Sequence, residues 1–249
     1  MFRAVLSLCR RELTRFFRQP SRIIGAAVTP LLFWLLIGSG FSGSFRMPGA
    51  PEGVGYLEYF FPGSIVLVLL FAAIFSNISV IEDRREGFLQ GVLVAPVPRW
   101  VIVAGKVLGG AFLAWVQALA FLALAPLTGI RLTPASFLGA AGVLALLAVA
   151  LTAVGFAFAW VLDSVQGFHA IMNTLLMPMW LLSGSLFPRS GAPAWLSAVM
   201  RVNPLTHGVE AFRGALYETP APLAVAVTLG LGIVAFAAGL LVTRGGRVE

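Results

Sequence analysis

Long apolar stretches, separated by short polar ones, make up most of this 249-residue chain. A helix needs about 20 apolar residues to cross a bilayer. Six stretches of 23 residues or more contain no Asp, Glu, Lys or Arg: 23–45, 59–81, 107–130, 132–162, 164–188 and 219–243. They are apolar on all sides, whereas the strands of a membrane barrel alternate in polarity over roughly ten residues. The pattern predicts an all-α polytopic membrane protein with six transmembrane helices, at 23–41, 59–81, 100–128, 135–162, 167–186 and 223–242.

The segment before the first predicted span, residues 2–19, has the period of an amphipathic helix. Its apolar positions are Phe2, Val5, Leu6, Cys9, Leu13, Phe16 and Phe17. Four arginines occupy the rest of the helical wheel: Arg10, Arg11, Arg15 and Arg18. We expect a helix that lies in the membrane interface, with its arginines directed toward lipid headgroups. Binding of a protein partner is the alternative.

The densest polar interruption lies at 82–98, between the second and third predicted spans. Charges of both signs and a glycine open it: Glu82, Asp83, Arg84, Arg85, Glu86 and Gly87. Four apolar residues follow, at spacings that place them on one face of a short helix: Phe88, Leu89, Val92 and Leu93. Such a helix is suited to docking on a partner. A solvated loop with one face touching lipid is the alternative.

The segment between the last two predicted spans, residues 187–218, contains a clear helix start. Asn203 is a favourable N-cap, and Pro204 suits the first turn that follows. Glu210 and Arg213 are three residues apart and can pair on the surface of that helix. We expect short external helices that lie against, or dip into, the outer leaflet.

Two features within the predicted spans bear on packing. Gly105-x-x-x-Gly109 allows a close helix crossing, although small residues at this spacing are frequent in any apolar helix. Pro178 lies inside the fifth predicted span and predicts a kink there.

Composition supports the membrane interpretation, because 59% of the residues are hydrophobic and 11% are charged, against about 25% charged in soluble domains. With the N-terminus inside, twelve of the 17 Lys and Arg residues fall in inside segments and five in outside segments. Both termini and 82–98 are therefore expected in the cytoplasm. This bias and anionic lipid account for the net charge of +7, so no nucleic acid partner is expected.

Residues suited to catalysis or metal binding are scarce. The two histidines are His169 and His207, and the pair His207-x-x-Glu210 has no second cluster to complete a metal site. No Ser/His/Asp set can be assembled, and no Walker phosphate loop is present. No ionisable residue lies deep in a predicted span, which disfavours ion-coupled transport. We therefore expect a non-enzymatic chain without metal or cofactor, and if it transports actively, its energy comes from another subunit.

In this order, the features resemble the membrane subunit, or permease, of type-2 ABC exporters. That family includes drug, polysaccharide and lipo-oligosaccharide export permeases. The resemblance covers essentially the whole chain. The segments that carry it are the Arg-rich N-terminal helix, EDRREG at 82–87 followed by LVAPVPR at 93–99 and Lys106, and LSGSLFP at 182–188 followed by Trp195-Leu196, Asn203-Pro204-Leu205 and Arg213.

The resemblance implies that 82–98 is a coupling helix, which sits in a cleft of a cytoplasmic ATPase. It also implies two copies of the permease and two ATPase chains, which carry ATP and Mg²⁺, in the cell membrane of a bacterium or archaeon. The substrate would pass between the permeases along the first, second and fifth spans. Aromatic candidates for that path are Phe33, Trp34, Phe71, Phe75 and Trp180. Packing within the protein or contact with lipid is the alternative role of these side chains.

The expected function is ATP-driven export of a hydrophobic or amphipathic substrate, either a drug-like molecule or a lipid. A lipid-linked glycan or polysaccharide is the alternative substrate. A passive channel or an ion-coupled carrier is disfavoured by the missing intramembrane charges. A membrane scaffold or enzyme is disfavoured by the missing catalytic set. A neighbouring gene for a nucleotide-binding ATPase would support only the exporter.

Overall fold

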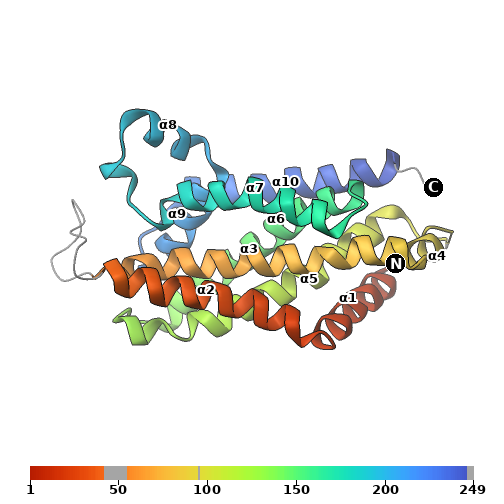
Figure 1. Ribbon diagram of the computed structural model, residues 1–249, viewed down its shortest axis with the longest axis horizontal. Helices are drawn as coiled ribbons and strands as arrows, with labels where there is room; N and C mark the ends of the chain where they lie inside the picture. The colour runs from red at the N-terminus through yellow and green to blue at the C-terminus, as the bar shows by residue number, and fades with distance from the viewer. Residues whose placement is uncertain (42–54, 95, 246–249) are drawn as a thin grey trace.

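A computed structural model describes residues 1–41, 55–94 and 96–245 of the chain, and no strand occurs among them. The helices that run along the long axis of the molecule alternate in direction, as Figure 1 shows. They are α2 (Pro20–Phe41), α3 (Tyr56–Arg85), α5 (Arg99–Leu122), α6 (Pro134–Val161), α7 (Val165–Trp180) and α10 (Pro222–Gly245). The chain is thus an all-α polytopic membrane protein, as its hydrophobic pattern predicts.

Five of these helices are long and apolar enough to cross a membrane: α2, α3, α5, α6 and α10. The remaining predicted span, 167–186, is divided between two elements. α7 has 16 residues, and the π-helical turn η2 (Leu181–Ser185) continues it. Gly184 lies inside this turn with a φ of 80°, a conformation that glycine adopts without steric cost. Pro178 lies within α7, and the departure from α-helical geometry begins three residues later. The count of six spans stays a prediction.

The centre of the bundle is α3, whose most apolar window is 89% buried. It packs against α2, α5, α6 and α7, and Figure 1 shows α2 and α7 on opposite sides of it. A helix that is apolar on every side can be buried on every side, and Phe60, Ile65 and Leu69 of α3 are fully buried. α3 therefore forms the core on which the other helices pack.

Small and polar side chains bring α3, α5 and α6 close together. A Cβ atom added to Gly110 of α5 would lie 2.7 Å from Oγ of Ser76 and 2.9 Å from Cγ2 of Thr152. Asn77 of α3 donates hydrogen bonds to the carbonyl of Ala73 at 2.7 Å and to that of Thr152, on α6, at 3.1 Å. The three helices thus approach closely enough for side chain to backbone hydrogen bonds across the crossing.

Other elements lie at the two ends of the bundle (Figure 1). The first helix, α1 (Phe2–Phe17), and α4 (Phe88–Val94) lie at the end where both termini are found. At the opposite end are η1 (Ala125–Thr128), η3 (Arg189–Gly191), α8 (Ala194–Val202) and α9 (Pro204–Leu216). The two ends therefore differ in structure, and each carries part of the predicted signature.

The boundary between α3 and α4 differs from the prediction. α3 continues to Arg85 instead of ending at residue 81, so Glu82–Arg85 form its last turn. Gly87 has a φ of 77° and donates its N–H to the carbonyl of Arg84 at 3.2 Å, which ends the helix. Among the described residues of the predicted 82–98 segment, only the seven of α4 form a separate short helix.

The crossing of α3, α5 and α6 leads to a first prediction. Gly110→Val should lower the free energy of unfolding by about 1–3 kcal/mol, because the new side chain would overlap Ser76 and Thr152. Thermal unfolding of the detergent-solubilised chain measures the effect. Gly142→Val in α6 is the matched control, since Gly142 is exposed and an added Cβ meets no atom within 4 Å. Equal unfolding temperatures for the two variants would contradict the close crossing.

Candidate functional site

The end of the bundle that carries both termini contains a buried lysine between two buried carboxylates. Lys106 of α5 donates from Nζ to Oε1 of Glu12, on α1, at 2.6 Å. Its ammonium group also pairs with the carboxylate of Asp83, on α3, which is 0% exposed. Ser79 donates from Oγ to the second oxygen of Glu12 at 2.6 Å. Because each buried charge has an opposite charge in contact, the cost of removing it from water is compensated.

Two arginines of α1 extend this arrangement toward the surface. Arg11 binds Asp83 through two parallel hydrogen bonds of 2.7 Å each, and this contact raises the pKa of its guanidinium group above the usual value. Arg15 pairs with Asp83 as well, and with Glu82 and Glu86 at 3.0 Å each. We call these residues the ion cluster: Arg11, Glu12, Arg15, Glu82, Asp83, Glu86 and Lys106. It joins α1 to α3 and α5.

α1 also packs directly on α5 at the glycine pair of the sequence. A Cβ atom on Gly105 would lie 2.6 Å from Cβ of Leu8, and one on Gly109 would lie 3.3 Å from Cα of Cys9. The Cys9 thiol donates to the carbonyl of Gly105 at 3.2 Å, and burial raises its pKa. The close crossing that Gly105-x-x-x-Gly109 allows is therefore made with α1.

α4 is attached to this same assembly. The guanidinium carbon of Arg11 lies 3.5 Å from the centroid of the Phe88 ring, a close cation–π contact. Leu89 is 3% exposed and belongs to the apolar core, against which Val92 and Leu93 also pack in part. Leu89 is therefore not available to a partner, whereas Phe88, Val92 and Leu93 are half-buried. The docking role of these four side chains stays a prediction, and the opposite face of α4 is exposed.

The two arginines that end α3 have a local structural role. Arg84 donates to the carbonyls of Ala159, at 3.1 Å, and of Trp160, and Arg85 donates to that of Asp163 at 2.6 Å. The last carbonyls of a helix have no partner within it, and cations are favourable there. Arg84 and Arg85 therefore cap the end of α6. Of the charged residues that open the predicted coupling segment, Arg85 and Glu86 are exposed.

The four arginines predicted to anchor the membrane fall into two groups. Arg10 and Arg18 are exposed, as the anchoring prediction requires. Arg11 and Arg15 turn inward to the ion cluster, which corrects the expectation that all four face headgroups. Sequence reasoning also missed Glu12. The signal was its spacing of four residues from Leu8 and from Phe16, which places a carboxylate on the face of α1 that packs against α5 and α3.

At the opposite end, the external signature residues connect α9 to α3 and η2. Arg213 stacks on Tyr59, 4.1 Å from its ring centroid, and donates to its carbonyl at 3.1 Å. The Tyr59 hydroxyl donates in turn to the carbonyl of Gly184 at 2.7 Å. Asn203 accepts from the N–H of Leu205, as the predicted cap does, and donates to the carbonyl of Met179 at 2.6 Å.

Two other signature residues have simpler positions. Pro204 begins α9. The predicted pair of Glu210 with Arg213 is absent, because Arg213 is drawn to Tyr59. Glu210 instead lies 3.8 Å from Arg189 and 3.6 Å from His207, a pair that is ionic when the histidine is protonated.

The five aromatic candidates for a substrate path separate by burial. Trp34 is buried against Phe61 and Phe121, with ring centroids 5.4 and 5.8 Å away. Trp180 is fully buried and donates to the carbonyl of Gly63 at 2.8 Å. These two side chains pack within the chain, the alternative role considered for them.

The other three aromatic candidates are half-buried, along α2 and α3. Phe33 meets the edge of Trp180 at 6.5 Å between ring centroids. Phe71 stacks on Phe75 at 6.4 Å, and Phe75 meets His169 of α7 at 5.6 Å. A half-exposed aromatic surface therefore follows α2, α3 and α7. Among the described residues, no three His, Cys, Asp or Glu side chains are placed to share a metal ion.

The ion cluster leads to a second prediction. Lys106→Met should lower the free energy of unfolding by about 3–5 kcal/mol, because Glu12 and Asp83 would lose the cation buried between them. Thermal unfolding in detergent measures the loss. Adding Glu12→Gln to Lys106→Met should restore part of it, and Arg10→Met, at an exposed position of α1, is the control. If Lys106→Met unfolds at the same temperature as Arg10→Met, the cluster does not stabilise the fold.

Known proteins that are similar to this chain carry the names of transport permeases. A transport permease, ycf38, of Cyanophora paradoxa is 29% identical over 209 residues, which cover 83% of this chain and 71% of the relative. The daunorubicin resistance ABC transporter permease protein DrrB1 of Streptomyces coeruleorubidus is 27% identical, over 87% of this chain and 76% of the length of DrrB1. The inner membrane transport permease YadH of Escherichia coli strain K12 is 26% identical, over 96% of this chain and 92% of the length of YadH. The family described as ABC-2 type transporter matches residues 3–217, and the chain therefore belongs to that family.

Proposed function

We propose that this chain is the permease of an ATP-driven exporter and that a separate ATPase moves it through α4. The observation that carries the proposal is the attachment of α4. This helix follows the last turn of α3 directly, its Leu89 lies in the core, and its Phe88 is held by Arg11 of the ion cluster. A force applied to the outer face of α4 would therefore act on α3 and α1 together. ATP and Mg²⁺ would be bound by the ATPase.

The surface offered to the ATPase is the outer face of α4 and the turn before it. Exposed residues there are Arg85, Glu86, Gln90, Gly91 and Val94. The side chain of Glu86 is 58% exposed even with its contact to Arg15. This surface mixes charged, polar and apolar groups, which is common in interfaces between separately folded proteins.

α3 is suited to carry movement across the membrane. Its 30 residues span about 45 Å at 1.5 Å per residue. One end enters the ion cluster through Asp83, and the other carries Tyr59, which binds Arg213 of α9 and Gly184 of η2. Polar contacts at both ends and close packing between them favour motion of α3 as one body. In this proposal, closure of the ATPase shifts α3, and the contacts of η2 and α9 shift with it.

The proposed substrate path runs between two copies of the chain along α2, α3 and α7. Half-buried Phe33, Phe71 and Phe75 lie on this side, and α2 exposes Leu32, Leu35 and Leu36 next to them. A second copy would cover part of this apolar surface. Aromatic and aliphatic walls favour a hydrophobic or amphipathic substrate, either a drug-like molecule or a lipid. The relation to a daunorubicin resistance permease supports the same class.

A third prediction tests the ATPase contact. Val94→Asp should abolish co-purification of the ATPase from mild-detergent membranes, because it places a charge on the outer face of α4. Val202→Asp in α8 is the matched control, since the two valines are 85% and 83% exposed and lie at opposite ends of the bundle. The amount of ATPase recovered per permease is the measurement. Retention of the ATPase by Val94→Asp, with both variants folded, would remove α4 from the contact.

A fourth prediction tests the orientation, which places both termini in the cytoplasm. In a Cys9→Ser background, Ser190→Cys should react with a membrane-impermeant thiol reagent in intact cells, whereas Gln90→Cys should react only after the cells are opened. Both positions are exposed, at opposite ends of the bundle. The reverse labelling pattern would place α4 outside and exclude a cytoplasmic ATPase as its partner.

A further inference from the structure

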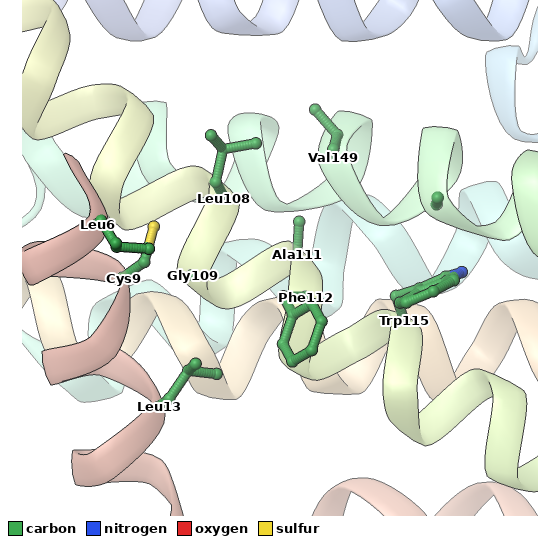
Figure 2. A pocket seen from close by; sticks show the side chains of 10 residues that line it. Leu6, Cys9, Leu13, Leu108, Gly109, Ala111, Phe112, Trp115 and Val149 are labelled. Atoms are coloured by element: carbon green, nitrogen blue, oxygen red, sulfur yellow. The ribbon is translucent and has the colours of Figure 1, made fainter. Parts of the chain in front are cut away.

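An open apolar pocket of about 450 Å³ lies beside the contact of α1 with α5, and α6 forms part of its wall. This volume is in the range of small-molecule sites, roughly 300–1,000 Å³. Figure 2 shows side chains of α1 on one side of the pocket and those of α5 and α6 on the other. The lining consists of Leu6, Cys9, Leu13, Leu108, Gly109, Ala111, Phe112, Trp115, Ala145 and Val149.

The lining offers no unused hydrogen-bonding side chain. Two of these side chains carry a polar donor, and each already has an acceptor. The Cys9 thiol donates to the carbonyl of Gly105 at 3.2 Å, and Nε1 of Trp115 donates to that of Ala141 at 2.8 Å. A polar ligand would lose its hydrogen bonds to water here without replacement. The chemical class that fits is therefore hydrocarbon.

The pocket opens on an apolar outer surface of the bundle. Leu6 is 59% exposed and Phe112 is 48% exposed, and Val116, one turn after Phe112 on α5, is exposed as well. None of its walls comes from α2, α3 or α7, so it is separate from the proposed substrate path. In a chain that spans a bilayer, such a surface faces lipid.

Charge at the rim identifies the kind of lipid. Arg3 and Arg10 are exposed, and neither has an ion pair within the part of the chain that the structure describes. They stand three and four residues from Leu6, so they border the pocket on the surface of α1. This combination contrasts with Arg11 and Arg15, whose charges are compensated by carboxylates. Two uncompensated cations beside a hydrocarbon pocket match an anionic headgroup attached to an acyl chain.

We infer that this pocket binds an acyl chain of an anionic phospholipid, whose headgroup is held by Arg3 and Arg10. The bound lipid fills the space between α1 and α5 on the side away from the ion cluster. It thereby supports α1, the helix that holds Phe88 of α4 through Arg11. The site goes beyond the proposed export function, since it requires neither the ATPase nor the transported substrate.

Native mass spectrometry of the full chain in mild detergent tests this inference. The delipidated protein is titrated with phosphatidylglycerol and with phosphatidylcholine of identical acyl chains. We expect one phosphatidylglycerol per chain, bound about tenfold or more tightly than phosphatidylcholine, since each arginine favours an anionic lipid. Ala145→Phe should weaken this binding about tenfold or more by filling the pocket. Ala237→Phe, at an exposed position of α10, should leave it unchanged.

Two further variants keep the test decisive. Leu6→Trp fills the pocket from the exposed surface of α1 and replaces Ala145→Phe if that variant fails to fold. Arg3→Gln with Arg10→Gln should bring phosphatidylglycerol affinity to the level of phosphatidylcholine. Equal phosphatidylglycerol binding by the filled variants and by Ala237→Phe would overturn the inference, and so would equal affinity of the wild type for the two lipids. If the wild type is a dimer and the filled variants are monomers, a second copy of the chain occupies the pocket, and the lipid inference is overturned.

Discussion

The pairing of buried Lys106 with Glu12 and Asp83 is the interaction on which the end of the bundle with both termini depends. Each of the three charged groups lies on a different helix, and in an apolar interior each needs an opposite charge in contact. The ion pairs among these groups hold α1 against the ends of α3 and α5. The N-terminal helix α1 is thus part of the folded protein, and its position follows from electrostatics as well as from its apolar face.

The same constraint connects α1 to α4. Asp83 accepts hydrogen bonds from Arg11, and the Arg11 guanidinium in turn covers Phe88. Arg84 and Arg85, which follow Asp83, complete the end of α6. One turn of α3 therefore organises four neighbouring helices. A protein that binds and moves the exposed face of α4 would therefore move these helices with it. This linkage is the basis of the proposed ATP-driven function.

The lipid pocket adds a second support to α1. On one side this helix is held by ion pairs in the interior, and on the other it borders an apolar opening with two uncompensated arginines. The first support depends on residues within the chain, whereas the second depends on the membrane around it. Of the four arginines predicted to anchor the membrane, Arg11 and Arg15 thus serve the fold, whereas Arg10 and Arg18 are exposed. In the proposed lipid site, Arg3 and Arg10 would hold the headgroup.

The helical, membrane-spanning character of the chain and the amphipathic N-terminal helix could be predicted from the sequence alone, because they depend on the local density and period of apolar residues. The cap at Asn203 was also predictable, since its hydrogen bond joins residues two apart. The partners of the charged residues were not. Arg11 and Asp83 are 72 positions apart and Glu12 and Lys106 are 94, so only the packing of α1, α3 and α5 brings them together. The burial of Leu89 likewise required the tertiary structure, because the spacing of apolar residues shows that a helix has an apolar face, while the neighbouring helices decide what covers it.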